Sequence, residues 1–249
     1  MHRAAFAELH LAGWSYQLLP VPPELFEETV RALPAAGCVG ANATLPHKQA
    51  ALELADEASA TALAVGAANT LSFGPDGRIY AANTDAPALI ASLPLSVAGT
   101  SAGILGAGGT ARSAAWALQQ AGADVAVWNR TPERARELAA QLGVRAIERV
   151  EPAAILCNCT TVGLDDRWTT KNEILQSLAL DTDLITTYAC VVDFVYGKRA
   201  SELLALARGL GVLTVDGPTI LCEQGALSFE LWTGLPAPRA AMARAVAGV

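Results

Sequence analysis

Lys48 lies in the stretch Asn-Ala-Thr-Leu-Pro-His-Lys, where an amine could exchange a proton with a bound molecule. It is one of only three lysines among 249 residues, against fourteen arginines. Thr44 or Leu45 would cap a helix that begins at Pro46, which places Lys48 in the first turn. The helix dipole disfavours an ammonium there, which would suit a base that works near neutral pH. The alternative is an ordinary solvated lysine.

Asp85 is the second candidate for proton exchange, in the stretch Asn-Thr-Asp-Ala-Pro-Ala-Leu. It follows a predicted strand and precedes a predicted helix, so from position alone it would be an N-cap. A carboxylate at this place could also hold Lys48 and share its proton. Asn69 ends the loop before a predicted hairpin and could orient a substrate hydroxyl.

A glycine-rich turn follows a predicted strand and opens a predicted helix. The pattern G-x-G-x-x-A gives a tight turn, a close approach of the backbone to a pyrophosphate, and close packing of helix on strand. The free N–H groups of the helix start would bind the phosphates. The order of strand, turn, helix and second strand predicts a dinucleotide site, formed by Gly106, Ala107, Gly108, Gly109, Thr110 and Ala111.

The end of the next strand indicates which dinucleotide binds. NAD sites place an acidic residue there, for the ribose 2′-hydroxyl. This sequence has Asn129, Arg130 and Thr131, with Arg134 one turn later. Guanidinium groups and a hydroxyl suit a 2′-phosphate, so the cofactor predicted is NADP. Thr131 could at the same time cap the following helix, with Pro132 in its first position.

The first 92 residues or so mix helices with short strands. We expect strands at 13–21 and 37–45, helices at 22–33 and 46–63, and a hairpin over 69–85. The hairpin would turn at Pro75-Asp76-Gly77.

From about residue 100 strands alternate with helices, which is typical of a parallel sheet covered on both faces. A linker is expected at 94–101 and a long helix at the end of the chain. The five strands are expected at 101–106, 123–129, 153–160, 190–197 and 211–215, and the helices at 109–122, 131–143, 199–211 and 218–234.

Composition excludes several classes of protein. A net charge of −7 argues against nucleic-acid binding, and scattered arginines argue against a membrane surface. No apolar stretch is long enough to span a bilayer, so we expect a cytoplasmic protein. The five cysteines are odd in number and apolar in context, which indicates buried thiols. Cys157 and Cys159 could share a face of a strand, but without a nearby histidine we expect no metal site.

Seven motifs together resemble the shikimate dehydrogenase family in order and spacing, between about residues 40 and 234. They are NATLPHK, GAANTL, NTDAPAL, GAGGTAR, WNRTPERA, NCTTVGL and QGALSFELWTG. The resemblance implies an α/β protein of two domains, which reduces 3-dehydroshikimate to shikimate with NADPH. Residues 1–92 and 217–249 would form the substrate domain, with the C-terminal helix packed back on it. Residues 93–216 would form the Rossmann-like NADP domain.

The resemblance also assigns roles to single residues. Lys48 and Asp85 match the family's catalytic pair. Thr160 and Val162, in the motif NCTTVGL, would contact the cofactor. The remaining matches are substrate ligands in the family, namely Thr44, Asn69, Tyr196 and Gln224. The protein would be a monomer or a homodimer.

The start of the chain departs from the family pattern. The family begins with a further strand and a Ser-x-Ser motif that binds the substrate carboxylate, whereas this sequence begins where that stretch ends. Either the start codon is assigned too late, which we favour, or the chain is a short relative. The second case would give a non-catalytic NADP- or shikimate-binding module. A third alternative is a dehydrogenase for quinate or an amino analogue.

Overall fold

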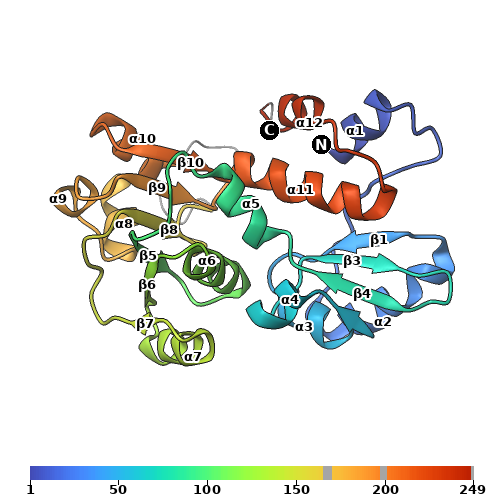
Figure 1. Ribbon diagram of the computed structural model, residues 1–249, viewed down its shortest axis with the longest axis horizontal. Helices are drawn as coiled ribbons and strands as arrows, with labels where there is room; N and C mark the ends of the chain where they lie inside the picture. Colours follow the sequence, from blue (N-terminus) through green and yellow to red (C-terminus); the bar gives the residue numbers. More distant parts are fainter. Residues whose placement is uncertain (165–169, 197–200, 248–249) are drawn as a thin grey trace. The chain divides into compact units, whose positions relative to one another are not determined.

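The computed structural model describes residues 1–164, 170–196 and 201–247. Contacts within the chain divide it into two compact units, each with its own sheet. The first unit contains Met1–Ala88 and Leu221–Gly248, and the second contains Leu89–Ile220. Both sheets are seen in the ribbon of Figure 1. The α/β class expected from the sequence is confirmed.

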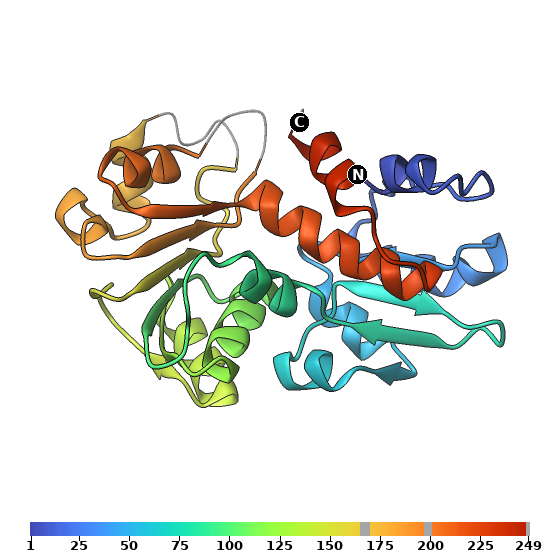
Figure 2. The ribbon, with the colours of Figure 1, turned by 45° about the horizontal axis from the view of Figure 1, so that its top comes forward.

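The first unit is built on a four-stranded sheet in the order β1-β3-β4-β2. Strands β1 (Gly40–Asn42), β3 (Thr70–Phe73) and β4 (Ile79–Ala82) are antiparallel, and β2 (Glu57–Ala58) runs parallel to β4. Helix α11 (Gly217–Thr233) begins in the second unit and lies against this sheet, where Trp232 Nε1 donates to Leu71 O at 2.9 Å (Figure 2). The remaining helices are α1 (His2–Glu8), α2 (Phe26–Ala32), α3 (Lys48–Glu53), α4 (Ala60–Val65) and α12 (Arg239–Val246), with 3-10 turns at Pro23–Leu25 and Pro34–Ala36.

The hairpin expected over 69–85 is confirmed as β3 and β4. Asp76 Oδ1 accepts from the backbone N of Arg78 at 3.1 Å, and Gly77 takes a left-handed conformation, with φ of +80°. Aspartate and glycine therefore form the turn for the reasons that make them common in turns.

The strand expected at 13–21 is wrong. This segment is irregular, and its leucines are exposed, Leu18 by 88%. Its backbone is held by side chains instead of a neighbouring strand. Arg3 Nε donates to Tyr16 O at 2.7 Å, and the His47 ring bonds Val21 O at 2.9 Å.

The single helix expected at 46–63 is also wrong, because it is two helices, α3 and α4, separated by β2. The break follows from pairing with β4. Asp56 N donates to Ile79 O at 2.9 Å, and Ile79 N donates to Asp56 Oδ2 at 2.8 Å. Ser59 then caps α4 by accepting from Ala62 N at 3.1 Å. These long-range bonds override a local sequence that favours a helix throughout.

The second unit is a six-stranded parallel sheet in the order β10-β9-β8-β5-β6-β7. From β5 the chain proceeds outward through β6 to β7 and then returns to β8 on the other side, as in doubly wound folds. The strands are β5 (Ser101–Leu105), β6 (Asp124–Trp128), β7 (Arg145–Ala146), β8 (Ile155–Asn158), β9 (Cys190–Asp193) and β10 (Leu213–Asp216). The strand β7 was not expected from the sequence.

The helices of this unit pack on the sheet. Helix α6 contacts β5 and β6, and α7 contacts β6 and β7, while α8 and α10 share an apolar core with Leu156 of β8 and Val191 of β9. The expected helix 199–211 is observed from residue 202, and residues 199 and 200 lie outside the described residues. The helices are α5 (Asp85–Ser92), α6 (Gly109–Gln120), α7 (Pro132–Leu142), α8 (Lys171–Ser177), α9 (Thr182–Ile185) and α10 (Glu202–Gly209). Helices α8, α9 and α12 were not expected.

Candidate active site

Lys48 is the first residue of α3, two residues later than the helix start expected at Pro46. Residues 44–47 form a turn instead, in which His47 N donates to Thr44 O at 2.7 Å. The His47 ring stacks on Phe26, with centroids 4.3 Å apart. The turn and this stacking fix the backbone from which the Lys48 side chain projects.

Lys48 and Asp85 form an ion pair within the first unit. Lys48 Nζ lies 2.7 Å from Asp85 Oδ2, and the two side chains are only 15% and 10% exposed. Asp85 is the first residue of α5, and Asn83 Oδ1 provides the cap by accepting from Ala86 N at 3.0 Å. The N-cap interpretation of Asp85 is therefore wrong, and its carboxylate is directed to the lysine.

Asn69 holds the second oxygen of the same carboxylate. Its amide nitrogen donates to Asp85 Oδ1 at 2.9 Å and to Gln224 Oε1 at 3.2 Å. Its amide oxygen accepts from the backbone N of Thr84 at 2.8 Å. With Asn69 only 2% exposed, this contact fixes the orientation of the Asp85 carboxylate.

Asn69 belongs to a cluster of hydroxyl and amide side chains that are buried, except for the half-buried Asn42. Sequence reasoning had found only Asn69 among its members. Ser228 of α11 is fully buried and bonds with Thr70 Oγ1 at 2.8 Å. Asn42 donates to Ser228 Oγ at 3.0 Å and accepts from Tyr16 Oη at 3.0 Å. The members of this cluster lie inside the sequence motifs given above. No single motif predicts that they meet, because only the fold brings α11 onto β1 and β3. The cluster is Asn42, Asn69, Thr70, Thr84 and Ser228.

Of the other proposed substrate ligands, Gln224 is 8% exposed and lies beside Asn69. Thr44 is exposed, one turn before Lys48. Tyr196 belongs to the second unit and is 44% exposed. The structure therefore brings Lys48, Asp85, Asn69 and Gln224 together within one unit, and the roles of all six residues stay predictions.

The glycine turn has the conformation that the sequence predicted. Gly106 follows β5 with φ of +111°, which L side chains rarely adopt, and Gly108 precedes the twelve-residue helix α6. Ala111 is fully buried at 0% exposure, as close packing of helix on strand requires. The backbone amides at the start of α6 can thus receive a pyrophosphate.

The end of β6 offers groups for a 2′-phosphate. Arg130, Thr131 and Arg134 are all exposed. Thr131 occupies the N-cap position of α7, with Pro132 first in the helix, but its side chain makes no capping bond. Asn129 Nδ2 donates to Thr131 O at 2.9 Å, which shapes the strand end. These residues fit a phosphorylated ribose.

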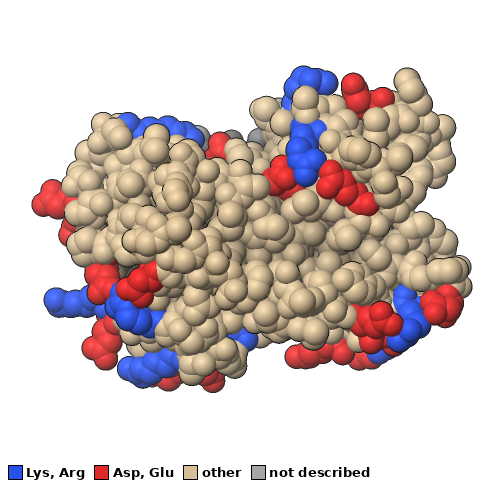
Figure 3. Space-filling view, viewed as in Figure 1, with Lys and Arg blue, Asp and Glu red and all other residues tan. Residues whose placement is uncertain are grey.

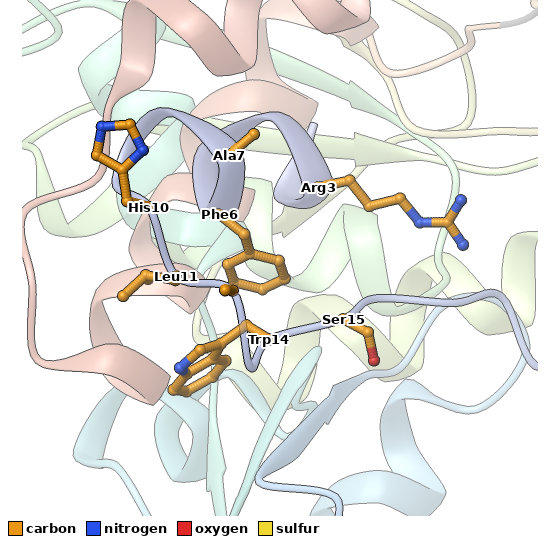
Figure 4. A pocket seen from close by; sticks show the side chains of 8 residues that line it. Arg3, Phe6, Ala7, His10, Leu11, Trp14 and Ser15 are labelled. Atoms are coloured by element: carbon orange, nitrogen blue, oxygen red, sulfur yellow. The ribbon is translucent and has the colours of Figure 1, made fainter.

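Two further surface features lie apart from these residues. A hollow of about 530 Å³ in the first unit is lined by residues 3–15, including Arg3, Phe6 and Trp14, and contains none of the candidate site residues (Figure 4). On the face shown in Figure 3, the described basic and acidic side chains are interspersed over much of the surface. No helix among the described residues is both long and apolar enough to cross a membrane.

Three protein-family models match the chain in sequence order. The shikimate dehydrogenase substrate-binding domain matches residues 1–71, and the shikimate/quinate 5-dehydrogenase model matches residues 90–156. The shikimate 5′-dehydrogenase C-terminal domain matches residues 219–247.

Curated relatives cover almost the whole chain. The NADP(+) shikimate dehydrogenase of Methylobacterium radiotolerans is 42% identical over 93% of this chain and 84% of its own length. The enzyme of the same name from Thermus thermophilus is 38% identical over 94% of this chain and 87% of its own.

Solved structures show the same fold. Shikimate 5-dehydrogenase of Thermus thermophilus, in complex with NADP(H) and shikimate, is 36% identical with a TM-score of 0.85, covering 99% of this chain and 92% of its own. The 5-ketofructose reductase of a Gluconobacter species is 28% identical with a TM-score of 0.82, covering 99% and 91%.

Proposed function

Because the chain belongs to the shikimate dehydrogenase family, we propose that it is an NADP-dependent oxidoreductase that reduces 3-dehydroshikimate to shikimate. Lys48 and Asp85 are its acid–base pair. The observation that carries the proposal is their contact of 2.7 Å, with the carboxylate oriented by Asn69.

The chemistry needs a proton as well as a hydride. NADPH, when bound, would supply the hydride for the substrate carbonyl carbon. Lys48 Nζ donates the proton to the C3 oxygen, which becomes a hydroxyl, and in the reverse reaction it accepts that proton. Asp85 orients the amine through the contact of 2.7 Å. Because both side chains are largely shielded from water, the attraction between them is stronger than it would be in solution.

The two substrates are assigned to different parts of the chain. We assign NADP to the second unit, with the glycine turn at the pyrophosphate and Arg130, Thr131 and Arg134 at the 2′-phosphate. Shikimate is assigned to the first unit, where Asn69 and Gln224 meet Lys48 and Asp85, with Thr44 close in sequence. Thr160 and Val162 would contact the cofactor in the same unit as the glycine turn, and Tyr196 stays a proposed substrate ligand.

The direct test is reduction of NADP+ by shikimate, followed by the absorbance of the reduced cofactor. We expect turnover with shikimate and a lower kcat/KM with quinate. Binding of both ligands without turnover would favour the non-catalytic module. A higher kcat/KM with quinate would favour the quinate alternative. 5-Ketofructose with NADPH belongs in the same panel, because a reductase for it shares the fold.

The choice of NADP over NAD is tested at Arg130. We expect Arg130→Ala to weaken the binding of NADPH by about 10- to 100-fold, since one charge-assisted hydrogen bond is worth about 1.5–3 kcal/mol. The affinity for NADH, which lacks the 2′-phosphate, should change little. Fluorescence titration with each cofactor measures both constants.

Arg136→Ala is the matched control, because Arg136 lies on α7, the helix that follows Arg130, but pairs with Glu133 and Glu148. Its cofactor preference should stay that of the wild type. An equal loss of NADPH and NADH affinity in Arg130→Ala would refute the assignment of the 2′-phosphate.

A further inference from the structure

Asp193 is a buried carboxylate to which the proposed reaction gives no role. It ends β9 in the parallel sheet and is only 2% exposed. Burial raises the pKa of Asp193 to about 6, although hydrogen bonds from Ser201, the backbone of Val195 and Asn158 act in the opposite direction. Burial of a carboxylate costs free energy unless hydrogen-bond donors surround it. The three donors therefore show which segments of the chain Asp193 holds in place.

The two carboxylate oxygens bond different parts of the unit. Oδ1 accepts from Asn158 Nδ2 at 2.9 Å and from Val195 N at 3.0 Å. Oδ2 accepts from Ser201 Oγ at 2.5 Å, and Ser201 caps α10 by accepting from Leu204 N at 3.1 Å. One oxygen is thus linked to the end of β8, and the other to the start of α10.

The link through Asn158 continues into the loop of residues 158–162. Asn158 Oδ1 accepts from Thr160 N at 3.1 Å and from Thr160 Oγ1 at 2.7 Å. Thr160 Oγ1 in turn accepts from Val162 N at 3.1 Å. A buried carboxylate therefore orients an amide, the amide orients a hydroxyl, and the hydroxyl fixes the backbone of the loop.

This loop lies beside the glycine turn. Cys159 N donates to Leu105 O at 2.9 Å, and a Cβ placed on Gly106 would lie 3.1 Å from Cys159 O. The groups proposed for the 2′-phosphate follow β6, and β8 lies on the other side of β5, so the loop would lie on the nicotinamide side of the dinucleotide.

We propose that Asp193 is a positioning residue for the cofactor: it fixes Asn158, and through Asn158 the loop 158–162, in the shape that receives the nicotinamide half of NADP. The inference rests on the proposed function, because it assumes NADP in this unit. The competing explanation is that Asp193 only secures the start of α10 through Ser201.

Three alanine variants separate these explanations, with NADPH binding measured directly by fluorescence titration. We expect Asp193→Ala and Asn158→Ala to raise the Kd for NADPH by about tenfold or more, since each frees the loop. Ser201→Ala removes the other contact of the carboxylate. It should lower the melting temperature but change the Kd by less than about twofold, because loss of a cap affects the helix.

Rescue and cofactor preference give two further readouts. Asp193→Asn keeps one oxygen for Asn158 and Val195 and can donate to Ser201, so its Kd should stay within about threefold of the wild type. The loss of affinity in Asp193→Ala should be equal for NADPH and NADH, because the residues proposed to bind the 2′-phosphate are unchanged.

Three results would overturn the inference. They are an unchanged Kd for NADPH in Asp193→Ala, an unchanged Kd in Asn158→Ala, or a Kd in Ser201→Ala that rises as much as in Asp193→Ala. If Asp193→Ala does not fold, the comparison of Asn158→Ala with Ser201→Ala decides. Wild-type protein that binds no NADPH would instead refute the proposed function itself, and the inference with it.

Discussion

Replacing Lys48 by alanine is expected to lower kcat for shikimate oxidation by about 10²- to 10⁴-fold, the usual contribution of a general acid–base group. The physical reason is that Lys48 Nζ is the group proposed to exchange the proton of the substrate oxygen. Steady-state assays give kcat, and fluorescence titration gives the affinity for NADPH. That affinity should stay within about threefold of the wild type, because the cofactor groups belong to the other unit.

Lys48→Arg sharpens this test. Removing one member of a shielded ion pair leaves Asp85 uncompensated, so Lys48→Ala will also lose stability. Arginine keeps the positive charge beside Asp85, but its guanidinium does not release a proton at neutral pH. Lys48→Arg should therefore melt close to the wild type and still turn over slowly.

The matched control is Lys171→Ala, because Lys171 is also the first residue of a helix, α8, but is exposed. Its turnover should equal that of the wild type. A small primary amine added to Lys48→Ala should restore part of the rate if the missing group is a proton carrier. A kcat within about threefold of the wild type in Lys48→Arg would remove Lys48 from the proton transfer.

Local sequence was sufficient wherever a feature depends on its own few residues. The hairpin turn at Asp76 and Gly77 is closed by a bond between neighbours, so its residues alone predict it. The same holds for the glycine turn, where Gly106 can adopt its positive φ because it has no side chain. Clear alternation of strands and helices likewise predicted the doubly wound sheet.

Contacts between distant segments could not be predicted in this way. The break between α3 and α4 depends on pairing of Asp56 with Ile79, 23 residues later. Asn42 and Ser228 meet across 186 residues, and no local pattern gives Ser228 a partner. The sequence proposed Asp85 as either a cap or a partner of Lys48, and only the coordinates of Asn83 and Lys48 decide for the second.

Gly106→Ala is expected to lower both the affinity for NADPH and the stability of the protein. At a φ of +111° an alanine is strained by about 1–3 kcal/mol. Its Cβ would lie 3.1 Å from Cys159 O, which is backbone and cannot move aside as a flexible side chain would. The turn must therefore shift, and with it the amides that receive the pyrophosphate. We expect a Kd for NADPH raised by about 100-fold and a lower melting temperature.

Gly108→Ala separates the effect on binding from the effect on folding. Gly108 has φ of −89°, which any residue adopts, and a Cβ there has nothing within 4 Å. The melting temperature should therefore stay that of the wild type. If a pyrophosphate approaches this backbone, however, the added methyl occupies its place, and the Kd for NADPH should still rise by about tenfold or more. Unchanged affinity in both variants would show that the cofactor does not bind at this turn, whatever their stability.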